Sequence, residues 1–123
     1  MPDQTPVLDE SVLAELQSST GDDAAFVREL IDTFLADVSV QLDGIAAAVE
    51  ANDPAALVRP AHTLKSGSAT VGAMRLAAVA RELEFAGRSG ALDAGAQRGL
   101  ETARAEADAA AQAIAAWLDR EVG

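Results

Sequence analysis

One histidine stands within a helical turn of two cations. His62 is the only histidine of the chain, in the stretch RPAHTLKSGSATVG over residues 59 to 72. An imidazole is substantially neutral at cytoplasmic pH, so a ring nitrogen can attack an electrophilic phosphorus atom. The phosphoryl group then adds close to two negative charges, which a nearby cation would offset. If the segment is helical, Arg59 at i−3 and Lys65 at i+3 are placed for this role.

The pattern of apolar residues around His62 predicts which way the histidine faces. A buried seam is predicted from the helical recurrence of Leu57, Ala61, Leu64, Ser68 and Val71. This seam turns His62 toward solvent. Its neighbours on the outer face are Arg59, Lys65, Ser66 and Ala69, with Val58 at the edge. Small side chains would let another protein's active site approach closely, so we expect Val58, Arg59, Ser66 and Ala69 to bind a partner, with a rim from the preceding helix.

Three residues of the same stretch suggest structural roles. Pro60 lacks an N–H group and presses on the carbonyl of Ala56, so it predicts a bend or break just before His62, with a lost main-chain hydrogen bond. Gly67 falls beside the seam and suggests close helix packing. Gly72 suits the left-handed position just past a helix C-terminus.

Helical periodicity runs through the chain, and no alternating strand pattern is found. Five helices are predicted, at about residues 9–17, 22–51, 54–71, 73–87 and 92–119. We expect Asp9 and Asp53 to be N-caps, Thr20 to form a capping box with Asp23, and Gly87 to begin the turn that closes the fourth helix.

The predicted helices each carry an apolar seam. The inward positions are Val12, Leu13 and Leu16 in the first helix, Val27, Leu30, Phe34, Val38, Leu42, Ile45 and Val49 in the second, Leu76, Ala80 and Leu83 in the fourth, and Leu100, Ala103, Ala107, Ala110, Ile114 and Leu118 in the fifth. Four long helices with short connections predict an all-α, antiparallel up-and-down four-helix bundle. The short first helix is expected to cover one end, and residues 1–123 to form one domain.

Composition excludes several function classes. The chain has 123 residues, no Cys, and 9 Lys and Arg against 20 Asp and Glu, a formal charge of −11. Such a charge repels phosphate backbones and anionic lipid, so neither nucleic acid nor a membrane is an expected partner. No window is apolar enough to span a bilayer, and no signal peptide opens the chain. We expect a cytoplasmic monomer without a metal site.

The stretch AHTLKSGSATVGAMRLAAVARELE, residues 61 to 84, resembles the signature of histidine-containing phosphotransfer (HPt) domains. That signature has His-x-Leu-Lys, small residues, a Gly, and a Leu-rich helix ending in Leu-Glu or Leu-Gln. The matching residues are His62, Leu64, Lys65, Ser68, Gly72, Leu76, Leu83 and Glu84. One departure is the order Ser66-Gly67, where the family often has Gly followed by Ser.

The resemblance implies a phosphoryl carrier of bacterial multistep signalling. His62 would accept phosphate from an aspartyl phosphate on the receiver domain of a response regulator or hybrid histidine kinase, and pass it to another receiver aspartate. The receiver would supply Mg²⁺ and most of the catalytic apparatus, so this chain is expected to hold no cofactor and not to be an enzyme. Lys65 would offset phosphoryl charge, and Glu84 on the next helix would orient the imidazole.

Two related functions remain open at the level of sequence. The chain could dock receivers without carrying phosphate, although His62 and Lys65 together argue against this. It could also be the N-terminal phosphoacceptor domain of a chemotaxis-type histidine kinase, which has a similar His-x-x-Lys stretch. A sequence that ends at Gly123 without a kinase domain favours a free-standing carrier or a piece of a hybrid kinase. An unrelated metal- or haem-binding bundle lacks ligands.

Overall fold

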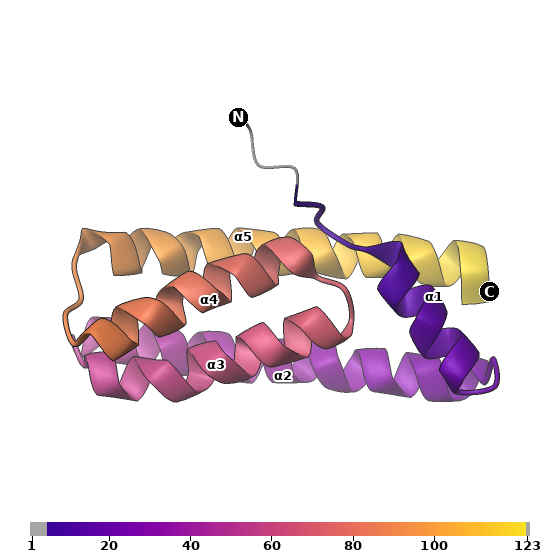
Figure 1. Cartoon of the computed structure of the whole chain (residues 1–123), viewed down its shortest axis with the longest axis horizontal. Coiled ribbons are helices and arrows are strands. Elements are labelled where there is room, and N and C mark those ends of the chain that lie inside the picture. The colour runs from indigo at the N-terminus through magenta and orange to yellow at the C-terminus, as the bar shows by residue number, and fades with distance from the viewer. Residues whose placement is uncertain (1–4, 123) are drawn as a thin grey trace.

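The computed structural model describes residues 5–122, and within them it shows helices and no strand (Figure 1). The helices are α1 (Glu10–Ser19), α2 (Ala24–Glu50), α3 (Pro54–Thr70), α4 (Met74–Ser89) and α5 (Ala94–Trp117), and a π-helical turn, η1 (Leu118–Val122), continues α5. The predicted all-α bundle is therefore confirmed. Residues 1–4 and 123 of the predicted single domain lie outside the described residues, and that domain assignment stays a prediction.

The four long helices alternate in direction and form two layers. Figure 1 shows α3 and α4 as a short hairpin lying across the longer α2 and α5. Because α3 has 17 residues and α4 has 16, against 27 in α2 and 24 in α5, the long helices extend beyond the hairpin at one end. Helix α1 covers this end, as the sequence predicted, and Arg120 in η1 forms an ion pair of 2.7 Å with Glu10 in α1.

The turn between α3 and α4 requires glycine for two reasons. Gly72 has φ +82°, the left-handed region predicted for it, and its Cβ would lie 2.5 Å from the Asp9 carbonyl oxygen. The amide of Asp9 donates to the Gly72 carbonyl at 2.7 Å, and the amide of Ala73 donates to the Ser68 carbonyl at 2.8 Å. These bonds close α3 and attach the start of α1 to the same turn.

The predicted helix starts are correct for α1 and α3, and wrong for α2. Asp9 and Asp53 accept backbone hydrogen bonds as N-caps, and Pro54 is the first residue of α3. Thr20 instead ends α1, donating its hydroxyl hydrogen to the Gln17 carbonyl, while Asp23 caps α2 by accepting from the Phe26 amide. Left-handed backbone at residues 21 and 22 reverses the chain between the two helices, which leaves Asp23 as the residue next to α2.

The buried core follows the predicted seams with small shifts. The α3 seam is buried throughout, as are Leu76, Ala80 and Leu83 of α4. In α2, Ile31 and Ala48 are buried where Leu30 and Val49 were expected, and these two are half-buried. Ala107 of α5 and Leu118 of η1 are half-buried, and Trp117 of α5, which the sequence pattern missed, is 2 % exposed.

Two expectations about α3 are wrong. The helix is continuous through Pro60, so a break is absent. The predicted loss of a main-chain hydrogen bond holds, because Pro60 has no N–H to donate to the Ala56 carbonyl. The Pro60 ring packs against Gly44 of α2, whose Cβ would lie only 3.2 Å from the proline Cβ. Gly67 is not a site of close packing, because its Cβ would meet Phe34 at an ordinary 3.7 Å.

The close approach lies instead between α3 and α4. Gly87 is buried inside α4, and its Cβ would lie 2.8 Å from the Pro54 carbonyl oxygen and 3.0 Å from Val58 Cγ2. The prediction that Gly87 begins a closing turn is therefore wrong: α4 continues to Ser89, and Gly90 is the left-handed cap. The two extra residues keep Arg88 within α4, one helical turn after Glu84.

Candidate functional site

The imidazole of His62 is accessible at the middle of α3. Its side chain is 54 % exposed, because the seam from Leu57 to Val71 faces the core on the other side of the helix. The prediction that His62 points to solvent is confirmed. The ring is thus carried by a continuous helix whose opposite side is buried, and its outer edge is open to another molecule.

Glu84 of α4 holds the inner edge of this ring. The Nδ1 atom of His62 lies 3.0 Å from Glu84 Oε2. Glu84 itself is only 6 % exposed, since it directly follows Leu83 on the side of α4 that packs against α3. The tight crossing at Gly87, one turn away, brings the two helices close enough for this contact. The position of Glu84 beside the imidazole is as the family resemblance implied.

Two cations share the Glu84 carboxylate with His62. Lys65 Nζ lies 2.7 Å from Oε1, and Arg88 donates to Oε2 from Nε at 3.1 Å and from Nη2 at 2.8 Å. The Lys65 ammonium lowers the pKa of Glu84 to about 2, with Arg88 and His62 adding to the effect and burial opposing it. Glu84 is thus a carboxylate at neutral pH although it is almost completely buried.

The charge of Glu84 determines which nitrogen of His62 can react. An ionised carboxylate only accepts hydrogen bonds, so the ring nitrogen that faces it must carry the hydrogen. That nitrogen is Nδ1. The lone pair of the neutral ring is then on Nε2, at the opposite edge, so the exposed imidazole presents a nucleophile.

Arg88 is the residue of this site that sequence reasoning missed. The prediction that Gly87 begins the closing turn places Arg88 in that turn and not on the helix beside Glu84. The i, i+4 spacing of Glu84 and Arg88 could have indicated the pair, since such residues are neighbours on a helix. Lys65 was expected to offset phosphoryl charge, and in the structure its ammonium contacts Glu84.

The remaining predicted residues surround the histidine at different depths. Arg59, Ser66 and Ala69 are exposed on α3, on the same side as His62. Val58 is half-buried, because its Cγ2 packs against Gly87 of α4. Among residues 5–122 there is no group of three His, Cys, Asp or Glu side chains arranged to hold a metal ion.

The comparisons with known proteins agree with this geometry. A family model described as "Hpt domain" matches residues 29–120. The chain belongs to the Hpt domain family. A solved structure, histidine-containing phosphotransfer protein B (HptB) from Pseudomonas aeruginosa PAO1, is similar with a TM-score of 0.84 and 34 % sequence identity, covering 95 % of this chain and 98 % of that one. No curated protein sequence matches the chain.

Membership gives the general function. Hpt proteins are phosphotransfer carriers of phosphorelays rather than catalysts, and they interact with the receiver domains of response regulators. The Hpt match includes α3 and α4, so it contains all four residues of the His62 site. None of the helices in residues 5–122 has the length and hydropathy needed to cross a bilayer.

Proposed function

We propose that His62 accepts a phosphoryl group from the aspartyl phosphate of a receiver domain and passes it to a second receiver aspartate. The observation that supports this most directly is the pairing of His62 Nδ1 with the ionised Glu84, which leaves Nε2 as the free nucleophile on an exposed ring. An adjacent positioning group that selects the reactive tautomer is what a nitrogen nucleophile requires.

In the transfer step this chain gains the phosphoryl group and loses no atom, and the leaving group is the aspartate of the receiver. The Nε2 lone pair attacks phosphorus, the bond from phosphorus to the aspartyl oxygen breaks, and the aspartate leaves as a carboxylate. The ring keeps its Nδ1 hydrogen and becomes a cation. Glu84, 3.0 Å from Nδ1, stabilises this cation, so the same contact supports both arrival of the phosphoryl group and its transfer onward.

The negative charge of the phosphoryl group is offset by cations of this chain and by Mg²⁺ on the receiver. Arg59 is exposed one turn before His62 and is available to offset phosphoryl charge. Lys65 is expected to contribute from its place beside Glu84. We expect Mg²⁺ to be held by the receiver, where the phosphoryl group leaves and arrives, and no cofactor by this chain.

The carrier function is favoured over the domain of a chemotaxis-type kinase. The similarity to HptB covers 98 % of that solved chain, whose description is a histidine-containing phosphotransfer protein and not a kinase. The upstream partner would be the receiver of a hybrid histidine kinase and the downstream partner that of a response regulator.

The experiment is incubation with a phosphorylated receiver domain, followed by an assay for acid-labile, base-stable phosphate on this chain. We expect phosphate on the wild type and none on His62→Gln, whose side chain has no nucleophilic nitrogen. Equal labelling of the two proteins would reject His62 as the acceptor. Circular dichroism of the variant provides the control for folding.

A further inference from the structure

The charges of this acidic chain are distributed unevenly. Residues 54 to 89, which contain α3 and α4, carry five Lys or Arg against two Asp or Glu, a formal charge of +3. The rest of the chain carries four against eighteen, a formal charge of −14. Figure 1 shows α3 and α4 as one layer of the bundle. His62 is in α3, so the positive charge lies in the layer that carries His62.

The outer side of α4 carries a stripe of basic and apolar residues. At successive spacings of 4, 3, 4 and 3 residues it contains Met74, Ala78, Arg81, Phe85 and Arg88, which we call the α4 stripe. All but Met74 are exposed, and no acidic residue is among them. Phe85 is 74 % exposed, more than any other large hydrophobic side chain of the described residues. A shallow hollow lined by Ala78, Arg81, Glu82 and Phe85 lies beside it.

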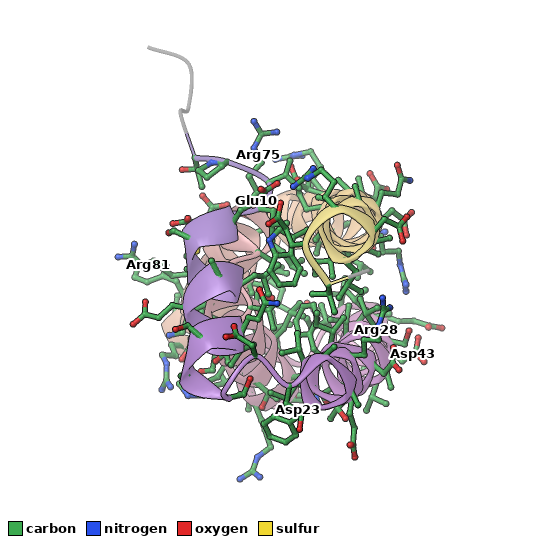
Figure 2. All side chains as sticks on the ribbon, turned by 90° about the vertical axis from the view of Figure 1, so that its right-hand side faces the viewer. Glu10, Asp23, Arg28, Asp43, Arg75 and Arg81 are labelled. Atoms are coloured by element: carbon green, nitrogen blue, oxygen red, sulfur yellow. The ribbon has the colours of Figure 1, made fainter. Side chains whose placement is uncertain are left out.

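The α4 stripe borders the His62 site directly. Arg88, at one end of the stripe, bonds the same Glu84 oxygen that contacts His62. Arg81 has no ion pair within residues 5–122. In Figure 2 its side chain projects from the side of the bundle on which α1 lies, away from α2 and α5. The face around His62 thus extends from α3 onto α4 with unpaired positive charge and an exposed aromatic ring.

We propose that the α4 stripe is a docking surface for an acidic and partly apolar surface of the receiver domain that exchanges phosphate with His62. This inference rests on the proposed function. Charge complementarity selects the partner, because an acidic protein surface is attracted to the +3 layer and repelled by the remaining −14 in other orientations. Phe85 supplies an aromatic anchor of the kind that concentrates binding energy at interfaces.

The experiment measures transfer from a receiver domain phosphorylated with acetyl phosphate and freed of excess donor. Arg81→Glu is compared with Arg104→Glu, an equal charge change on the exposed side of α5. Phe85→Ala is compared with Phe26→Ala, another exposed phenylalanine, on α2. All four variants change exposed side chains, and thermal unfolding is measured for each.

We expect Arg81→Glu to lower the bimolecular transfer rate about five- to tenfold at low salt, with the difference shrinking at 0.5 M NaCl, since exposed charges are screened. We expect Phe85→Ala to weaken receiver binding about tenfold at either salt. The first-order rate at saturating receiver should stay unchanged in both, because neither residue touches the imidazole.

The inference would be overturned, with the proposed function intact, if the α4 variants transfer and bind like their controls. Equal losses for Arg81→Glu and Arg104→Glu would be one such result and would reflect net charge alone. Failure of the proposed function is distinguishable, since wild type would then receive no phosphate from any receiver tested. Docking is measured without the chemistry by titrating the unphosphorylated receiver into His62→Gln. The same titration is repeated with Arg81→Glu or Phe85→Ala added to His62→Gln.

Discussion

At the residue scale, the site depends on one buried carboxylate that serves three partners. Glu84 bonds His62, Lys65 and Arg88, and these contacts hold its pKa near 2. The sequence indicated His62, Lys65 and Glu84 one by one. It could not show that Lys65 contacts Glu84, because helical spacing fixes the face of each helix and not which residues meet across two helices.

Glu84→Ala should change which nitrogen of His62 carries the hydrogen. In the wild type at pH 8 we expect the Nδ1–H form to dominate, since Nδ1 faces a carboxylate. Without Glu84 this preference should be lost, and phosphoryl transfer to His62 should slow by about tenfold, in line with the loss of a hydrogen bond to a charged group. Nitrogen-15 NMR of the imidazole measures the tautomer, and transfer from a receiver measures the rate.

The matched control is Glu82→Ala, which removes an exposed carboxylate two residues away on the same helix. It should leave the tautomer and the first-order transfer rate at saturating receiver as in the wild type. The assignment of Glu84 as the positioning residue fails if Glu84→Ala and Glu82→Ala give the same imidazole spectrum.

At the scale of elements, the sequence predicted the helices well where caps are local and less well where two helices meet. Asp9 and Asp53 could be identified as N-caps because each side chain accepts a hydrogen bond from a backbone amide at most three residues later in the sequence. Gly67 and Gly87 could not be told apart, since a glycine inside a helix and one at its end look alike until the neighbouring helix is known. The same holds for Pro60, which fits against Gly44 in an unbroken helix.

Gly87→Ala and Gly67→Ala should have opposite effects on stability. An alanine Cβ at Gly87 would approach the Pro54 carbonyl oxygen to 2.8 Å, a backbone atom that can move only with its helix. We expect a loss of about 1–3 kcal/mol in unfolding free energy. At Gly67 the new Cβ meets Phe34 at 3.7 Å, and the better helix propensity of alanine should add up to about 1 kcal/mol.

Urea unfolding of the two variants and the wild type measures both effects. Gly87→Ala should also disturb the contact between His62 and Glu84, because α3 and α4 must separate to admit the methyl group. If Gly87→Ala is as stable as the wild type, the crossing is looser than the structure shows.

At the scale of the whole molecule, the chain has a large negative charge, and the His62 site also depends on the negative charge of Glu84. A net charge of −11 destabilises the compact state at neutral pH through self-repulsion, and protonation of exposed carboxylates relieves it as the pH falls. Glu84 acts in the opposite direction. Its carboxylate is stabilised in the folded chain by Lys65, Arg88 and His62, so its protonation removes favourable interactions.

The contribution of Glu84 should be lost in a defined window of pH. Its pKa falls from 4.5 to about 2 on folding, so below pH 4.5 the unfolded chain binds a proton that the folded chain does not. The stabilisation is therefore complete above pH 4.5 and disappears as the pH falls toward 2. Comparing wild type with Glu84→Gln cancels the other carboxylates, which titrate in both proteins.

The measurement is urea unfolding of wild type, Glu84→Gln and Glu82→Gln between pH 7 and pH 2.5. We expect the wild type to be more stable than Glu84→Gln at pH 7 and to lose most of that difference by pH 2.5. Glu82→Gln controls for the removal of one exposed carboxylate. A stability difference between wild type and Glu84→Gln that stays constant over this range would mean that Glu84 titrates alike in both states, and that Lys65 and Arg88 do not hold it as a buried charge.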